Sequence, residues 1–185
     1  MDNVSKAIEV LNAGGVILYT TETVCGLGCL TSSQEAIEKI YKIKQRDFNQ
    51  KLILLIGDDR KLNNYVREVP EMAWDLIDYA EKQPTIIYPN AINLPKILVS
   101  DDGSVAIRVV TNGPLHSFLK KLKAPLTSTS ANISGSISPS IIKEVSKEIL
   151  SKVDFILDLP QINSSKRPSS IIKLQTNGEV KIIRK

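Results

Sequence analysis

The sequence predicts a single α/β domain, and three observations lead to that prediction. Short apolar runs typical of strands alternate with apolar stripes at helical spacing along residues 1–185. The run 52–56 is uninterrupted Leu and Ile, which indicates a strand covered on both faces. Residues 170–174 and 179–184 flank Thr176-Asn177-Gly178 as the strands of a hairpin would, so part of the sheet is antiparallel. The order of elements is therefore not a clean doubly wound repeat, and no linker divides the chain.

Caps and turns set the elements expected in the first half of the chain. One helical stripe ends at Gly14-Gly15, and Ser32-Ser33-Gln34-Glu35 matches the capping box that opens a second helix. This second helix delivers Lys44 and Arg46 at its C-terminal end. In order, we expect a helix over 4–11, a buried strand over 16–19, a polar loop over 20–28, the capped helix, and the strand over 52–56.

In the second half, the alternating run 104–110 is the clearest strand signal. Its Val and Ile residues share one face, which leaves Arg108 on the other. Ser138-Pro139 resembles an N-cap followed by Pro at the first helical position. In order, we expect a helix near 70–80, a strand over 85–88, a long loop over 89–102, the alternating strand, a helix over 114–121, an extended segment over 126–129, a helix after 138, a strand over 153–157, and the hairpin.

Composition and charge limit the class of protein to which the chain can belong. Hydrophobic residues make up 42% of the chain and charged residues 24%, as in globular proteins. The net charge of +4 suits an anionic ligand or nucleic acid without requiring either. No apolar run reaches membrane-spanning length, and no signal-peptide pattern opens the chain. Cys25 and Cys29 lie too close together to staple the fold, so we expect a reducing, cytoplasmic compartment.

The sequence is poorly supplied for metal binding and for covalent catalysis. His116 is the only histidine, and Cys25 and Cys29 do not form a C-x-x-C pair, so we expect no zinc site or other resident metal. A Ser-His-Asp triad stays open by residue count, but there is no G-x-S-x-G elbow. The phosphate-binding motif G-x-x-x-x-G-K-[ST] is also missing from the sequence.

Two polar elements suggest a nucleotide site. Ser128 to Gly135 is a loop of hydroxyls, an amide and free backbone N–H groups, which suits a polyanion or a polar small molecule. Lys44-Gln45-Arg46, with Lys51 just beyond it, supplies cationic groups that can converge on the same anion. Each element also has a plainer interpretation, as a surface turn or as a solvated helix end.

Taken together in order, four motifs resemble the YrdC-like family of single-domain threonylcarbamoyl-AMP synthases. Thr21–Gly28 is similar to the family's PTETVYGLG loop, and Lys44-Gln45-Arg46 to its KxR element. Ser104–Val109 is similar to its Arg-bearing strand, and Ser128–Gly135 to its STSANxSG loop with the SxN pair. Two smaller resemblances are the Ser-bearing segment 168–172 and Arg184 near the end of the domain.

The chain departs from the family pattern at several positions near these motifs. Thr20 stands where Pro is usual, and Cys25 replaces the usual aromatic residue. Gln50-Lys51 replaces a polar-Pro or polar-Gly step, and Leu55 lies where some relatives place a His. These departures concern the fine shape of the pocket.

The resemblance implies a fold and a reaction. The fold is a twisted mixed parallel and antiparallel sheet with flanking helices around a deep, basic cavity. The reaction joins L-threonine, bicarbonate or CO2, and ATP into threonylcarbamoyl-AMP and pyrophosphate, with Mg²⁺ arriving on the ATP. A downstream transferase then places the threonylcarbamoyl group on adenosine 37 of tRNA. Glu22 is an alternative Mg²⁺ contact, or simply a solvated loop residue.

The resemblance also assigns site residues. Lys44 and Arg46 neutralise the triphosphate and carry catalysis by electrostatic stabilisation, with no covalent nucleophile. The residues implied for ATP are Lys44, Arg46, Ser104, Ser130, Asn132, Ser138 and Arg184. Those implied for threonine are Thr23, Arg108, Ser128 and Ser169, with Arg108 on the carboxylate.

Two other functions stay open. One is a module that binds double-stranded RNA or tRNA, because the chain is basic; aromatic residues are only 5%, however, and no dense basic stripe is visible. The other is a YrdC-like paralogue with the same cavity and a different activity. A contact with tRNA also fits the synthase as a secondary property.

Overall fold

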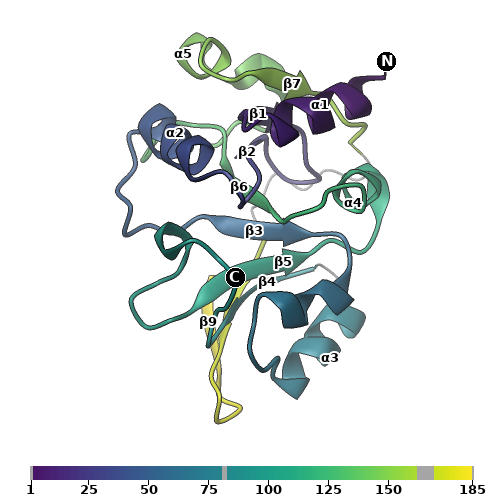
Figure 1. Ribbon diagram of the computed structural model, residues 1–185, viewed down its shortest axis with the longest axis vertical. Helices are drawn as coiled ribbons and strands as arrows, with labels where there is room; N and C mark the ends of the chain where they lie inside the picture. Colours follow the sequence, from purple (N-terminus) through teal and green to yellow (C-terminus); the bar gives the residue numbers. More distant parts are fainter. Residues whose placement is uncertain (1, 81–82, 162–168, 185) are drawn as a thin grey trace.

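The computed structural model describes residues 2–80, 83–161 and 169–184. Its strands form one mixed sheet in the order β7-β1-β2-β6-β3-β5-β4-β8-β9 (Figure 1). The strands are β1 Ile17–Tyr19, β2 Gly26–Gly28, β3 Ile53–Ile56, β4 Thr85–Tyr88, β5 Val105–Val109, β6 Leu126–Ser130, β7 Phe155–Leu157, β8 Ile171–Leu174 and β9 Val180–Arg184. The pairs β1–β7, β3–β5 and β4–β8 are parallel, and the other neighbours are antiparallel. The predicted mixed sheet is therefore confirmed.

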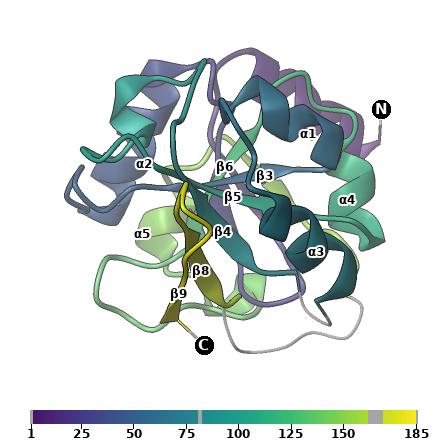
Figure 2. The ribbon, with the colours of Figure 1, turned by 90° about the horizontal axis from the view of Figure 1, so that it is seen from below.

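Helices lie on both faces of this sheet. They are α1 Asn3–Asn12, α2 Gln34–Lys44, α3 Glu71–Tyr79, α4 Gly113–Leu119 and α5 Lys147–Leu150, with 3₁₀ turns η1 Asp59–Asn64, η2 Lys96–Leu98 and η3 Ile142–Glu144. One hydrophobic cluster contains buried residues of α2, α3 and α5, and a second contains buried residues of α1 and α4. The β8–β9 hairpin extends from the far end of the sheet, nearest the viewer in Figure 2. No helix among the described residues is long and apolar enough to cross a membrane.

Alternation along the central strands separates the core from an open face. On β5, Val105, Ile107 and Val109 belong to the cluster under α2 and α3, whereas Ala106 and Arg108 face the other way. The same alternation holds on β3 and β4. Helices α1 and α4 pack over the β1, β6 and β7 end of this second face. The second face is therefore left open over β3, β5, β4 and β8, where the cavity lies.

Most expected elements occur close to their expected bounds, but three details differ. The segment 20–28, expected to be a polar loop, contains the strand β2. Both of its glycines are closely packed: a Cβ at Gly26 would lie 2.7 Å from the Tyr19 ring, and one at Gly28 only 2.4 Å from the Thr127 carbonyl oxygen. Glycine is thus required by close packing in a strand. The N-cap of α2 is Ser33, whose hydroxyl accepts from the Ala36 N–H at 3.3 Å, rather than the first serine of the expected box.

The helix expected after Ser138-Pro139 does not begin there. The carbonyl of Pro139 accepts from the Cys25 N–H at 2.8 Å, which holds this segment beside β2. Helical structure starts only at η3, and α5 is capped by Ser146. The expectation of a helix N-terminus at Ser138 was therefore wrong. The predicted terminal hairpin is confirmed, and Gly178 at its turn has a φ of 83°.

Candidate functional site

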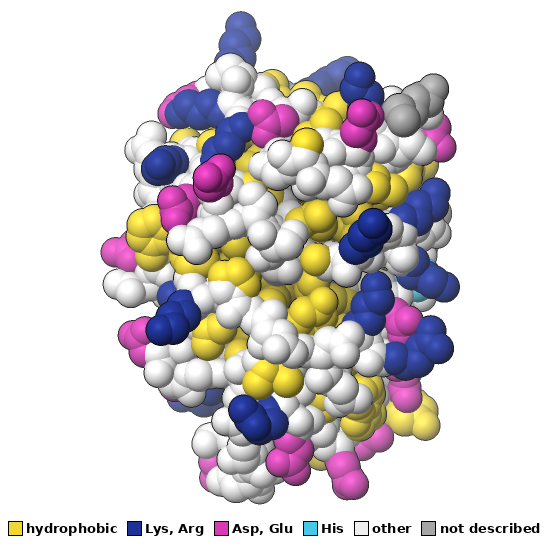
Figure 3. All heavy atoms as spheres, in the orientation of Figure 1, with side chains coloured by type: hydrophobic (Ala, Val, Ile, Leu, Met, Phe, Trp, Pro, Cys, Tyr) yellow, Lys and Arg dark blue, Asp and Glu magenta, His cyan; other side chains and the backbone are white. Residues whose placement is uncertain are grey.

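A cavity of about 720 Å³ lies on the open face of the sheet. It is bounded by the loop before β2, by β6, and by the strands β3, β5, β4 and β8. The cationic side chains that line it are Arg46, Lys51, Arg108, Lys173 and Arg184, and the lining carboxylates are Asp101 and Asp102. On the face of the molecule seen in Figure 3, apolar side chains are exposed in the centre and Lys and Arg side chains lie around them.

Arg46 lines the cavity because the chain turns sharply after α2. The C-cap Gln45 has a left-handed φ of 50°, which directs the next residue away from the helix axis. The Arg46 guanidinium donates to the carbonyls of Gln50 at 2.9 Å and Lys51 at 3.2 Å, and to the Thr129 hydroxyl at 3.3 Å. The cation is therefore fixed in place before any ligand arrives.

Lys44, the other member of the expected KxR pair, is buried instead. Only 1% of the residue is exposed, and it is not among the described residues that line the cavity. Its Nζ donates to the carbonyls of Ser130 at 2.5 Å and Asn132 at 2.7 Å. Burial, reinforced by the positive charge of Arg46, lowers the pKa of Lys44 to about 8. The plainer alternative of a solvated helix end therefore does not hold for Lys44, whose ammonium binds the polar loop from inside the protein.

The polar loop after β6 divides its side chains between the cavity and itself. Ser130 and Ser138 line the cavity, and Ala131, which follows Ser130, is buried in the core. The Asn132 amide turns back, and its Nδ2 donates to the carbonyls of Ile133 at 2.9 Å and Ser136 at 2.7 Å. Asn132 therefore shapes the loop, and it is not among the described residues that line the cavity.

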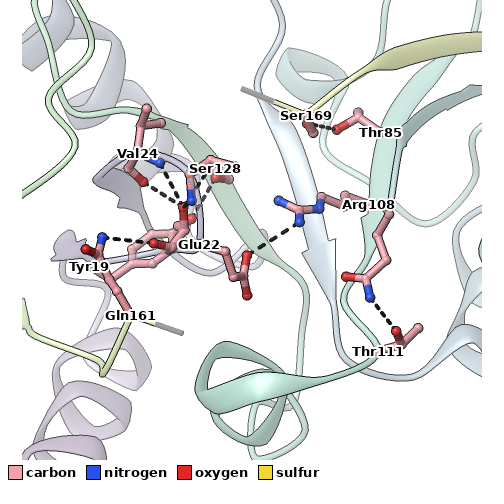
Figure 4. A network of polar contacts seen from close by, with 12 residues as sticks. Tyr19, Glu22, Val24, Thr85, Arg108, Thr111, Ser128, Gln161 and Ser169 are labelled. Carbon is pink, nitrogen blue, oxygen red and sulfur yellow. Dashed lines mark hydrogen bonds and ion pairs between the residues drawn. The ribbon is translucent and has the colours of Figure 1, made fainter. Parts of the chain in front are cut away.

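The residues expected around threonine all line the cavity: Thr23 from the loop before β2, Ser128 from β6, Arg108 from β5 and Ser169 from the segment before β8. Figure 4 shows Ser128 and Arg108 on opposite sides of the site. Arg108 points from β5 toward Glu22, with its Nη2 3.5 Å from the Glu22 Oε2. Ser128 accepts a hydrogen bond from the buried Tyr19 hydroxyl at 2.6 Å. The Thr23 hydroxyl lies 3.1 Å from that of Thr21.

Ser169 lies on the Arg108 side of the cavity beside Thr85 (Figure 4), and Ser104 lies at the start of β5, toward the other end. The Ser169 hydroxyl lies 3.0 Å from that of Thr85, and its carbonyl accepts from Arg184 at 2.6 and 3.0 Å. Ser104 donates to Asp102 at 2.6 Å. The expected site residues thus share one cavity, with the exception of Lys44 and Asn132.

Sequence reasoning missed the charged pair Asp102 and Lys173 at the Ser104 end of the cavity. Lys173 donates to Asp102 at 2.5 Å, and this bond, followed by those from Ser104, lowers the pKa of the Asp102 carboxyl to about 2. Alternation along β8 was the available signal, because Ile171 and Lys173 share the face that lines the cavity. Nothing local indicates that Asp102, at a turn before β5, faces the same place.

One departure from the family pattern, at Thr20, has a structural explanation. Thr20 is buried, donates to the Leu159 carbonyl at 2.8 Å and accepts from the Leu159 N–H at 2.6 Å, so it ties the loop before β2 to the segment after β7. Burial raises the pKa of Cys25 to about 11 and that of Cys29 to about 12, so both free thiols stay protonated packing groups at neutral pH. Leu55 and Cys25 line the cavity.

Comparison with known proteins gives consistent matches over nearly the whole chain. A family model for Sua5/YciO/YrdC, described as telomere recombination, matches residues 9–185. The chain is 33% identical over 180 residues to a threonylcarbamoyl-AMP synthase of Pseudoalteromonas translucida, covering 96% of this chain and 95% of that protein. It is 35% identical over 176 residues to a Methanocaldococcus jannaschii protein provisionally given the same name, covering 94% and 81% of the two chains.

Solved structures agree with the sequence matches. The P. abyssi Sua5 complex with L-threonine superposes with a TM-score of 0.83 at 26% identity, covering 92% of this chain. E. coli YciO superposes with a TM-score of 0.82 at 25% identity, covering 98% of this chain and 87% of its own. This chain spans only 50% of the length of that Sua5 structure. The family model and both sequence matches place the chain in the Sua5/YciO/YrdC family.

Proposed function

We propose that this protein is an L-threonylcarbamoyladenylate synthase. It forms threonylcarbamoyl-AMP and pyrophosphate from L-threonine, bicarbonate or CO2, and ATP, for the modification of adenosine 37 in tRNA. Two relatives above 30% identity carry the name threonylcarbamoyl-AMP synthase, and the Sua5 relative has been crystallised with L-threonine. These names favour the synthase over a module that only binds RNA.

The observation that carries the proposal is the placement of two arginines in one cavity. Arg46 enters from the end of α2 and Arg108 from β5, and both line the same space of about 720 Å³. That volume lies within the usual range of about 300–1,000 Å³ for small-molecule sites. One cavity can therefore hold the triphosphate at one arginine and the amino acid at the other.

The chemistry needs positioning and charge stabilisation. The amine of threonine takes up CO2 and loses a proton to become a carbamate. A carbamate oxygen attacks the α-phosphorus of ATP, and the bond to the departing pyrophosphate breaks. Negative charge on the phosphoryl oxygens grows in the transition state, so a prepositioned guanidinium such as that of Arg46 stabilises it.

Each side of the cavity has a proposed role. Arg46, Ser104, Ser130, Ser138 and Arg184 bind ATP. Lys44 and Asn132 support ATP binding indirectly, because their hydrogen bonds shape the loop that carries Ser130 and Ser138. The groups proposed for threonine are Thr23, Arg108, Ser128 and Ser169.

We also propose that Mg²⁺ enters with ATP and is bound mainly by the triphosphate. Of the two lining carboxylates, Asp102 already accepts from Ser104 and Lys173, which leaves Asp101 as the one with capacity to spare. A separate transferase consumes the adenylate. The two buried free thiols suit a reducing, cytoplasmic compartment.

The test is a reaction with ATP, Mg²⁺, bicarbonate and L-threonine, followed by pyrophosphate release and by mass spectrometry of the products. We expect pyrophosphate and threonylcarbamoyl-AMP only when threonine and bicarbonate are both present. ATP turnover that is indifferent to threonine would favour a paralogue with another activity. RNA binding without any ATP turnover would favour the RNA module.

A further inference from the structure

We propose that Glu22 recognises the ammonium group of the amino-acid substrate beside Arg108, which takes its carboxylate; this inference rests on the proposed function. Glu22 lies in the loop before β2, between Thr21 and Thr23, which both line the cavity. Its carboxylate faces the Arg108 guanidinium from the opposite side of the site (Figure 4). Arg108 lines the cavity and Glu22 does not, but their contact puts a negative charge directly beside the positive charge of that wall.

The contact between these two charges is incomplete. Nη2 of Arg108 and Oε2 of Glu22 are 3.5 Å apart, whereas a strong charge-assisted bond between such groups is about 2.7–2.9 Å long. The Nε of Arg108 is buried and has no hydrogen-bond partner among the described residues. A guanidinium has five N–H donors in a planar fork. Arg108 therefore keeps donors for a second carboxylate while Glu22 stays beside it.

The hydroxyl of Ser128 on β6, which lines the same cavity, is also free to donate. The Tyr19 hydroxyl donates to Ser128 Oγ at 2.6 Å, and burial raises the pKa of Tyr19, so the phenol keeps its proton. Because Ser128 accepts that bond, its own O–H is left to donate to a ligand. Arg108 and Ser128 together offer donors that suit a carboxylate.

The position of Glu22 is prepared by the loop that carries it. The Thr21 hydroxyl accepts from the N–H groups of Thr23 at 3.0 Å and Val24 at 3.2 Å, and donates to the Val24 carbonyl at 2.7 Å. Nε2 of Gln161 donates to the Thr21 carbonyl at 3.0 Å. These bonds close a tight turn around Glu22, whose side chain is 25% exposed.

The charges match a zwitterion better than a simple anion. Arg108 and Glu22 together carry no net charge, so a carboxylate alone gains from the arginine and is repelled by the glutamate. An α-amino acid carries its ammonium one carbon away from its carboxylate, so both of its charges find opposite partners. Glu22 then selects amino acids over carboxylic acids and fixes the nitrogen that must react with CO2.

Calorimetric titrations with two ligands test this role. L-Threonine carries the amine, and 3-hydroxybutanoate keeps the carboxylate and hydroxyl but lacks the amine; its weaker binding is measured by displacement. The variant is Glu22→Gln, which keeps the shape of the side chain and removes its charge. Glu35→Gln, an exposed residue in the first turn of α2, is the matched control.

We expect Glu22→Gln to weaken threonine binding by about tenfold, as the loss of a hydrogen bond to a charged group does, while 3-hydroxybutanoate binds equally or more tightly. Equal losses for both ligands would show that Glu22 only orients Arg108. Unchanged threonine binding by Glu22→Gln would also overturn the inference. The proposed function would still stand in that case, provided that the wild-type protein forms threonylcarbamoyl-AMP from threonine. A wild-type protein that binds no threonine would remove both proposals.

Discussion

Replacing Lys44 with Met should destabilise the fold, and not only weaken catalysis. The ammonium of Lys44 is buried and donates to the carbonyls of Ser130 at 2.5 Å and Asn132 at 2.7 Å. The Ser134 N–H donates to the Lys44 carbonyl at 2.9 Å, so backbone and side chain both bind the same loop. Met keeps the apolar stem but has no donor, so two carbonyls lose their charged partner.

The size of the effect follows from these contacts. A hydrogen bond to a charged group contributes about 1.5–3 kcal/mol, and a buried acceptor left without a partner costs about 1–3 kcal/mol. Removing the buried ammonium also recovers part of its desolvation cost, which reduces the net loss. We expect the free energy of unfolding to fall by about 2–4 kcal/mol. For a domain of this size, that corresponds to a fall in Tm of roughly 4–16 °C.

Scanning calorimetry measures the Tm, and isothermal titration well below it measures ATP affinity. Lys42→Met is the matched control, because Lys42 is an exposed lysine in the last turn of the same helix. We expect Lys44→Met alone to lower the Tm. If its Tm equals that of the control while ATP affinity collapses, Lys44 acts directly on the phosphates and our interpretation of the buried ammonium fails.

Four further outcomes are expected. Arg46→Ala should cost about 2–4 kcal/mol of transition-state stabilisation in steady-state kinetics; a kcat/KM close to the wild-type value would contradict the phosphate role. Arg108→Leu should raise the KM for threonine far more than that for ATP, and equal effects on both would argue against a carboxylate contact. Asn132→Ala should lower the Tm, since its amide bonds two loop carbonyls; an unchanged Tm with lost ATP binding would show a direct contact instead. Burial lowers the pKa of Lys44 from 10.5 to about 8, so the native state loses this proton at a lower pH than the unfolded state. The free energy of unfolding of the wild type, minus that of Lys44→Met, should therefore rise from pH 8 to pH 10.5. A difference that stays constant over this range would contradict the pKa shift.

The sequence was sufficient where local pattern and tertiary structure agree. Alternation along 104–110 predicted that Arg108 faces away from the apolar layer, and the structure places it in the cavity. Alternation along the extended segment likewise predicts that Ala131, between Ser130 and Asn132, turns into the core, and it is 1% exposed. These predictions worked because strand alternation is a property of the backbone alone.

The misses have a common physical cause, which is that contacts distant in sequence decide them. A lysine at a helix end is ordinarily solvated, and only the loop 86 residues further on supplies the carbonyls that bury Lys44. Glycine is uncommon in strands, so the sequence of β2 predicted a loop. In the structure, the Tyr19 ring leaves no room for a side chain at Gly26, so only glycine fits in this strand. Ser138-Pro139 carries a genuine helix-start signal, but its backbone bond to Cys25 takes precedence.

The cavity exists because one sheet is covered unequally on its two faces. Residues of β3, β4 and β5 that point toward α2 and α3 are apolar and complete a core, while the alternate residues point into a space that α1 and α4 leave open. Two arginines enter this space from distant parts of the chain: Arg46 is held by backbone carbonyls, and Arg108 lies beside Glu22 at 3.5 Å. A charge that is fixed like that of Arg46 costs little reorganisation when a ligand arrives, which is the condition for electrostatic stabilisation of a phosphoryl-transfer transition state. The buried ammonium of Lys44 serves the same end, since it holds the loop that brings Ser130 to the cavity wall opposite β5.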